Sequence, residues 1–93
     1  MDGGLKIYNN APASRFELRI NGAFAVLDYR IEGGTVFLLH VEVPAAERGR
    51  GIAGELSHAA LEFARDNGLK VVPRCPSIAT YMRRHPELLR SAF

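Results

Sequence analysis

Cysteine is almost absent from this sequence, because Cys75 is the only one among 93 residues. A single cysteine cannot form an internal disulfide, and it cannot build the cysteine-rich cage of a structural zinc site. Chains without disulfides are typical of reducing compartments. We therefore expect an intracellular, cytoplasmic protein that uses no metal.

Long apolar segments are also missing. No apolar run approaches the roughly 20 residues that a transmembrane helix needs, and the first six residues lack the apolar core of a secretory signal. We expect neither membrane association nor a signal peptide. With 47% hydrophobic and 24% charged residues, the chain fits one globular domain over residues 1–93, as a monomer or a homodimer.

A large net charge is the third absence. Twelve Lys and Arg stand against ten Asp and Glu, which gives a net charge of +2. Nucleic-acid binding is not expected, because aromatic residues are not interleaved with the basic ones. The arginines that gather around the glycines and the last helix are Arg48, Arg50, Arg74, Arg83, Arg84 and Arg90. This local positive charge suits a small phosphate-bearing ligand, and a solvated basic face is the alternative.

The first half of the chain has the pattern of strands. Residues 15–20 alternate between apolar and polar side chains, which is typical of a half-buried strand. Asn21-Gly22 then gives a strong hairpin signal. A second strand is predicted over residues 23–31 and, after a glycine turn, a third over residues 35–43. Pro44 ends the third strand, because proline has no N–H to donate to a sheet.

The second half has the periodicity of helices. Apolar residues recur every three or four positions over residues 51–67, which predicts a helix with one apolar stripe. A short strand is predicted over residues 69–72, and then a helix over residues 76–84 with Pro76 in its first turn and Cys75 as its N-cap. The order β-β-β-α-β-α predicts an α+β fold: a three-stranded antiparallel meander, a crossover helix, a further strand and a C-terminal helix.

Three glycines stand within residues 47–54, between the third strand and the first helix. Glycine in a helix costs about 1 kcal/mol relative to alanine, and close approach of a ligand to backbone N–H groups is a physical reason to keep it. A helix N-terminus leaves N–H groups unpaired and attracts anions. No Ser, Thr, Asp or Asn stands at the expected N-cap. We therefore expect an anion site, and a glycine-rich loop without function is the alternative.

Two phosphate-binding motifs match these glycines in spacing alone. Gly49, Gly51 and Gly54 repeat the dinucleotide fingerprint, but the chain lacks the repeated βαβ units of that fold. Glu55 and Leu56 stand where a P-loop requires Lys and then Ser or Thr. Neither motif therefore accounts for the loop.

A third pattern, Arg48-x-x-Gly51-x-Ala53, resembles the (Gln/Arg)-x-x-Gly-x-(Gly/Ala) motif of the GNAT acetyltransferase superfamily. The likeness extends over residues 15–90 to the small stand-alone GNAT-like N-acetyltransferase domains. The segments that carry it are residues 40–44, 48–53, 72–76 and 81–87.

The resemblance implies a protein that binds acetyl-CoA as cosubstrate and transfers its acetyl group to an amine of unknown identity. In this family the glycine loop wraps the pyrophosphate, and we expect the backbone of the third strand to pair with the pantetheine arm. The expected cofactor-binding residues are Val41, Val43, Arg48, Gly49, Arg50, Gly51, Ile52, Ala53, Gly54 and Arg84. A non-catalytic CoA-binding or interaction module with the same fold is the alternative.

Cys75 is the first candidate for the chemistry. A thiol at a helix N-terminus beside Arg74 has its thiolate favoured. It is an acyl-accepting nucleophile, a group that lines the acetyl site, or an inert buried cysteine. The resemblance favours a lining role, because GNAT enzymes generally transfer acetyl directly to an amine.

His40, Glu42 and Tyr81 complete the candidate catalytic set. On the third strand, the alternation of side chains predicts that His40 and Glu42 share one face with Val36 and Leu38. Either one is a candidate base that acts through water, and the resemblance places Tyr81 near the leaving sulfur. The alternatives are an exposed sheet face for the first two residues and a core aromatic for Tyr81.

The chain departs from larger GNAT proteins at its N-terminal end. Those proteins carry a strand and two helices before the meander, and the helices build much of the acceptor site. Here only about fourteen residues precede Arg15. We therefore expect an acceptor pocket that is open, shallow or completed by a second chain.

Overall fold

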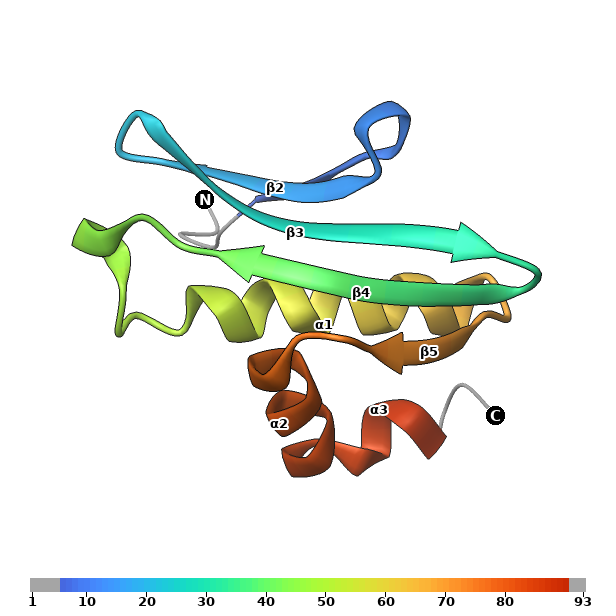
Figure 1. Cartoon of the computed structure of the whole chain (residues 1–93). Coiled ribbons are helices and arrows are strands. Elements are labelled where there is room, and N and C mark those ends of the chain that lie inside the picture. The colour runs from blue at the N-terminus through green and yellow to red at the C-terminus, as the bar shows by residue number, and fades with distance from the viewer. Residues whose placement is uncertain (1–5, 91–93) are drawn as a thin grey trace.

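The computed structural model describes residues 6–90, so the ends of the expected 1–93 domain lie outside the described residues. It confirms the α+β fold (Figure 1). Within the described residues, five strands form one sheet in the order β1-β2-β3-β4-β5. Their bounds are Ile7–Asn10, Arg15–Ile20, Ala23–Glu32, Thr35–Glu42 and Lys70–Pro73. The first four strands are antiparallel, and β5 runs parallel to β4.

The helices begin and end close to the residues that the sequence predicts. They are α1 (Ile52–Asp66), α2 (Pro76–Arg84) and α3 (Pro86–Arg90), and short 3₁₀ turns cover Ala11–Ala13 and Ala45–Glu47. Helix α1 begins at Ile52, and the residue before it, Gly51, is its N-cap and has a φ of 79°. Cys75 is the N-cap of α2, as expected.

Two elements are additions to the expected order. Strand β1 is a four-residue edge strand that pairs with β2, so the meander has four strands instead of three. Its sequence, with two asparagines, carries little strand signal of its own. Helix α3 follows because Pro86, which disfavours a helical conformation at His85, also suits the first position of a new helix.

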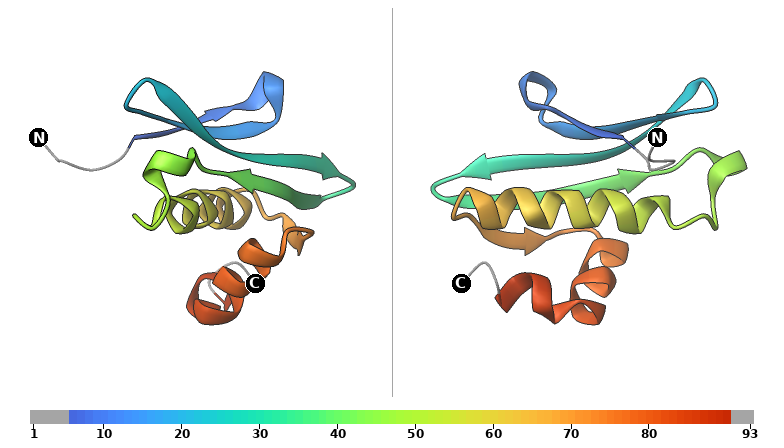
Figure 2. Two further views of the ribbon diagram at one scale, coloured as in Figure 1. Left: turned by 60° about the vertical axis from the view of Figure 1, so that its left-hand side comes forward. Right: turned by 180° about the vertical axis from the view of Figure 1, so that it is seen from behind.

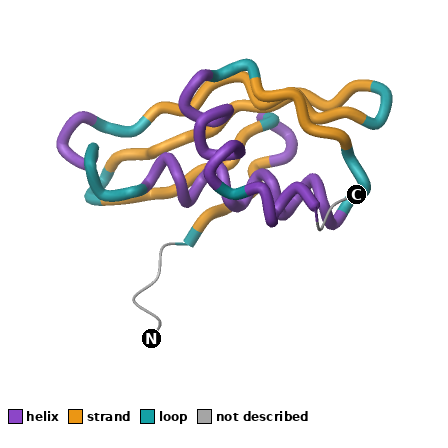
Figure 3. Tube along the Cα trace, turned by 90° about the horizontal axis from the view of Figure 1, so that it is seen from below, coloured by secondary structure: helices purple, strands orange, loops and turns teal. Residues whose placement is uncertain are grey.

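One face of the sheet carries the core. Helix α1 lies across this face, and α2 and α3 pack beside it (Figures 2 and 3). The largest fully buried side chains are Leu27, Leu38, Leu56, Ile78 and Val36. The described helices leave the opposite face of the sheet uncovered, and there Phe24 of β3 is 55% exposed.

Strand β4 contains one extra residue relative to β3. Tyr29 pairs with Leu38, whereas the adjacent Asp28 pairs with His40, so Leu39 has no partner of its own. This is a β-bulge, in which two residues of one strand oppose one residue of the other. The side-chain alternation of β4 therefore shifts by one residue at Leu39.

The shift corrects the expectation that His40 and Glu42 share a face with Val36 and Leu38. Val36 and Leu38 are fully buried in the core, and beyond the bulge it is Val41 that packs against the core. His40 and Glu42 project from the uncovered face instead. They do lie on the same side as each other, with 3.6 Å between His40 Nε2 and Glu42 Oε1.

The bulge also marks the point where β4 and β5 separate. The pairing of the two strands runs from Thr35 to Leu38 on β4, and the N–H of Arg74 donates the last hydrogen bond to the Leu38 carbonyl at 2.8 Å. Beyond it, β4 continues to Glu42 while the chain of β5 turns into α2. The β4 edge between Leu39 and Glu42 therefore faces a fork.

A buried carboxylate ties the loop before α1 to the hairpin between β2 and β3. Asn21 and Gly22 both have positive φ, as the hairpin prediction requires. Glu47 is 5% exposed and accepts hydrogen bonds from Asn21 Nδ2 at 2.7 Å and from the Arg50 guanidinium. The hydrogen bond from Asn21 lowers the pKa of Glu47, desolvation opposes this effect, and Arg50 lowers the pKa further.

This arrangement predicts a pH-dependent contribution to stability. A carboxyl with a lowered pKa in the folded state stabilises the protein above its unfolded-state pKa, and the effect is lost as the pH falls through the folded-state value. We expect Glu47→Gln to reduce the free energy of unfolding in urea at pH 7. The difference from wild type should narrow as the pH is lowered to about 3.

The matched control is Glu32→Gln, which removes an exposed ion pair with Arg30. Exposed pairs contribute about 0–1 kcal/mol, so this variant should unfold nearly as wild type does. A difference between Glu47→Gln and wild type that stays constant from pH 7 to about pH 3 would contradict the role given to the Glu47 carboxylate.

Candidate functional site

The loop before α1 has the backbone of an anion cradle. Gly49 and Gly51 have φ of 83° and 79°, in the left-handed region that favours glycine. A Cβ at either position would meet no atom within 4 Å, so the backbone conformation, and not a lack of space, requires glycine. Gly51 gives α1 no side-chain cap, which leaves the first N–H groups of the helix available to a ligand.

A small cavity of about 150 Å³ lies over this loop. Its lining contains most of the expected cofactor-binding residues: Val43, Arg48, Gly49, Gly51, Ile52, Ala53 and Gly54. It also contains Glu47, to which the sequence analysis gave no role. The sequence could have indicated a contact with Arg50, because Glu47 stands three residues before it. The other partner, Asn21, is distant in sequence, so only the fold shows that contact.

The two arginines of the cradle are engaged within the protein. Arg48 Nε donates to the Val43 carbonyl at 3.3 Å, and Arg50 contacts Glu47. Their side chains therefore brace the loop on both sides. Each contact uses one N–H of its guanidinium, so the other guanidinium N–H groups and the first amides of α1 are the donors left for a ligand.

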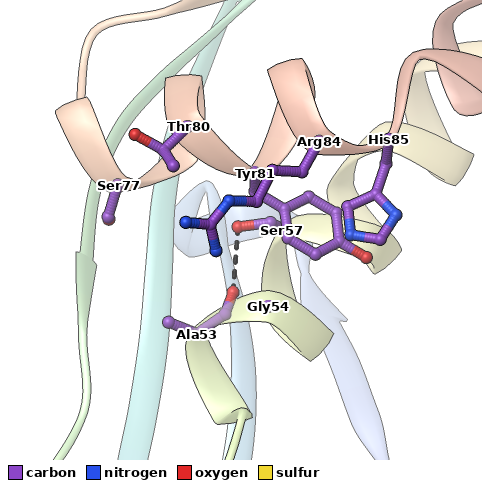
Figure 4. Close-up of a pocket in the computed structure, with 8 residues that line it drawn as sticks. All are labelled: Ala53, Gly54, Ser57, Ser77, Thr80, Tyr81, Arg84 and His85. Atoms are coloured by element: carbon purple, nitrogen blue, oxygen red, sulfur yellow. Dashed lines mark hydrogen bonds between the residues drawn. The ribbon is translucent and has the colours of Figure 1, made fainter.

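A larger cleft of about 520 Å³ opens between α1 and α2 (Figure 4). Its lining residues are Ala53, Gly54, Ser57, Ser77, Thr80, Tyr81, Arg84 and His85. Ala53 and Gly54 line both hollows, so the cleft adjoins the cradle. Arg84, an expected cofactor-binding residue, extends its guanidinium into the cleft. The hydroxyl residues Ser77 and Thr80 were not expected, because isolated Ser and Thr carry no motif.

Tyr81 occupies the centre of the cleft. Its ring lies over Gly54, where a Cβ would be 3.2 Å from Tyr81 Cε1, and it stacks on His85 with 4.2 Å between ring centroids. Gly54 is therefore explained by the close approach of Tyr81. Desolvation raises the pKa of Tyr81, and the nearby carboxylates of Glu55, Glu87 and Glu62 raise it further. The phenol consequently stays protonated at neutral pH.

Cys75 lies at the fork between β4 and β5. Its Sγ is 3.2 Å from Ser77 Oγ. Desolvation raises the pKa of the thiol, but hydrogen bonds outweigh it and lower the pKa overall. The bonds come from the Ser77 hydroxyl and from the backbone N–H groups of Ile78, Ser77 and Val41. Because Val41 belongs to β4, the sulfur bridges the two sides of the fork.

The candidate catalytic residues are thus divided between three places. Tyr81 is in the larger cleft, and Cys75 is at the fork. His40 and Glu42 are on the uncovered face of the sheet, with side chains 57% and 69% exposed, and neither belongs to the lining of the two hollows. The structure brings His40 and Glu42 together as a pair, but it does not place them in one cavity with Tyr81.

Residues 6–90 contain no group of three or more His, Cys, Asp and Glu side chains arranged to hold a metal ion. None of the helices in this part of the chain is long and apolar enough to cross a membrane.

Comparison with known proteins agrees with the geometry. The sequence pattern of the GCN5-related N-acetyltransferases matches residues 15–91. The chain is 38% identical over 87 residues to Protein NATD1 of Mus musculus, an alignment that covers 90% of this chain and 79% of that protein. It is 39% identical over 85 residues to Protein NATD1 of Xenopus tropicalis, with 88% and 78% covered. The human Protein NATD1 is 38% identical over 85 residues, with 88% and 75% covered. Because this pattern covers residues 15–91 and the relatives align over more than two thirds of their own length, the chain belongs to the family of GCN5-related N-acetyltransferases.

Proposed function

We propose that this protein binds acetyl-CoA and transfers its acetyl group to an amine. The observation that carries the proposal is the glycine cradle at the N-terminus of α1, which adjoins a cleft that holds a protonated tyrosine and an arginine. The uncapped amides suit a pyrophosphate, and the cleft and the fork offer room for the rest of an elongated cofactor.

The pantetheine arm would lie along the free edge of β4 as an added strand does. Two backbone groups expected to pair with it already have partners in the protein. Arg48 donates to the Val43 carbonyl, and the N–H of Val41 donates to the Cys75 sulfur. These internal contacts keep both backbone groups paired in the free protein. Binding would exchange them for contacts with the amides of pantetheine.

In the transfer step, the amine nitrogen attacks the thioester carbonyl carbon, a C–N bond forms and the C–S bond breaks. The departing thiolate needs a proton, and the raised pKa of Tyr81 keeps one available on its hydroxyl. The proton lost by the amine passes through water to His40 or Glu42, the candidate bases on the uncovered face. In this scheme the acceptor reaches the thioester from that face, and Cys75 lines the site without forming a covalent intermediate.

The alternative is a CoA-binding module without catalysis. The observation that favours it is the exposure of His40 and Glu42, which places the candidate bases away from the cleft. Both functions predict that CoA binds at the cradle, but only the acetyltransferase predicts turnover of acetyl-CoA.

CoA binding is tested by thermal unfolding. Ligands that bind the folded state raise the melting temperature, and at 100 times Kd the gain is about 2.7 kcal/mol, which amounts to several degrees in a domain of this size. We expect millimolar CoA to produce this shift. Gly51→Glu should abolish it, because the side chain places a carboxylate at the cradle.

Gly68→Glu is the matched control. Gly68 also has a positive φ, of 65°, and also flanks α1, but at the opposite end of the helix. Both variants carry a similar cost of about 1–2 kcal/mol from the left-handed conformation. Only Gly51→Glu should lose the response to CoA. An equal response to CoA in both variants would place the pyrophosphate elsewhere.

Transfer is tested by mass spectrometry of products formed from acetyl-CoA with a panel of amines that includes polyamines and lysine-rich peptides. We expect at least one acetylated product. Tyr81→Phe should form it about 100-fold more slowly with CoA binding unchanged, because general acid catalysis contributes about 10²–10⁴-fold. CoA binding without any product across the panel would support the non-catalytic module.

The environment of Cys75 predicts its reactivity. Because hydrogen bonds lower the pKa of Cys75, its thiolate forms at a lower pH than it would without these bonds. We expect the pH profile of iodoacetamide alkylation, followed by mass spectrometry, to be shifted downward accordingly. CoA should slow alkylation, because pantetheine would cover the fork. Alkylation that CoA does not slow, in a protein whose melting temperature CoA raises, would place pantetheine away from Cys75.

A further inference from the structure

One stripe of helix α1 is built around Tyr81 of α2. Gly54, His58 and Glu62 follow one another at intervals of four residues, which puts them on one face of the helix. Gly54 gives the ring its seat, with the 3.2 Å approach described above. Next along the stripe, His58 Nδ1 is 3.4 Å from the Tyr81 hydroxyl, and His58 Nε2 is 3.2 Å from Glu62 Oε2.

The chemistry of the three groups gives these contacts a direction. A carboxylate only accepts hydrogen bonds, so Nε2 of His58 carries the proton that Glu62 accepts. When His58 is neutral, its Nδ1 has a free lone pair and accepts from the Tyr81 O–H. When His58 is an imidazolium, Nδ1 also carries a proton and donates to the Tyr81 oxygen. In that second state the Tyr81 O–H is free to point into the cleft.

The surroundings hold the ring in place and are rich in acids. His85 stacks on the ring, with 28° between the ring planes, and pairs with Glu87. The titratable and charged groups that face Tyr81 and His58 are Glu55, Glu62 and Arg65 from α1, Arg84 from α2, and His85 and Glu87 beyond it. The carboxylates disfavour a negative charge on Tyr81. His58 is 42% exposed, so it exchanges protons with water while its partners hold it.

We infer that His58, held by Glu62, relays a proton from solvent to Tyr81 and so renews the donor of the transfer reaction; this inference rests on the proposed function. As the C–S bond breaks, the sulfur takes the proton of the Tyr81 hydroxyl. The phenolate takes the Nδ1 proton of the His58 imidazolium, and neutral His58 then regains a proton from water. The proton released by the attacking amine balances the one taken up.

The relay is tested with His58→Gln and His58→Asn in the full chain. Neither amide can transfer a proton, although each can form hydrogen bonds. We expect both variants to bind CoA with unchanged Kd and to lower kcat for the best amine of the panel about tenfold. This loss is smaller than the one expected for Tyr81→Phe, because the Tyr81 hydroxyl is still present. In wild type, kcat should fall as the pH rises through the titration of His58 measured by NMR, and this limb should vanish in both variants.

Glu62→Gln and Asp66→Asn form a matched pair, since each removes one negative charge from the last turns of α1. Glu62 contacts His58, whereas Asp66 pairs with Arg65. Glu62→Gln removes the carboxylate that holds His58 Nε2, so it should lower kcat while CoA binding stays unchanged. Asp66→Asn leaves the contact between Glu62 and His58 in place and should keep the wild-type kcat.

Failure of the proposed function and failure of the relay give different results. If wild type forms no product with any amine, the proposed function fails and the relay with it. If wild type is active and both His58 variants keep its kcat and pH profile, the relay is overturned while the proposed function stands. If kcat falls in His58→Gln but stays at the wild-type value in His58→Asn, the relay is also overturned. A side chain that cannot transfer a proton would then replace His58, whose role would be purely orienting.

Discussion

A single unpaired residue in β4 sets the position of the other parts of the site. Leu39 has no partner in β3, and every side chain beyond it changes face. Val41 is therefore turned to the core, and His40 and Glu42 are turned to the uncovered face. The same residue lies where β4 and β5 part, so the free edge of β4, the sulfur of Cys75 and the start of α2 all meet at the fork.

The glycines of the loop and helix serve two different physical needs. Gly49 and Gly51 adopt a backbone conformation that other residues rarely adopt, and their Cα hydrogens face open space. Gly54 has an ordinary helical conformation and is needed for space, because Tyr81 lies against it. One glycine-rich segment thus combines an open cradle for a ligand with a tight contact between two helices.

The sequence predicts the regular parts of this fold well, because the strands 15–20 and 23–31 and the helix 51–67 repeat with a clear period. The bulge leaves no such trace, since Leu39 extends an apolar run and its lack of a partner depends on pairing with β3. For the site, the cradle follows from local signals, namely glycines before an uncapped helix. The contact between Tyr81 and His58 joins residues 23 positions apart, so only the packing of α1 and α2 shows it.

The link between Asn21 and Glu47 joins segments that are 26 residues apart. Because Glu47 is buried at the base of the loop, opening of the loop would break its hydrogen bonds with Asn21 and Arg50. The tip of the β2–β3 hairpin and the loop before α1 therefore belong to one cooperative unit of local unfolding. We therefore expect the amide hydrogens of these two distant segments to be protected together, and a ligand held by the loop to slow exchange at the hairpin as well.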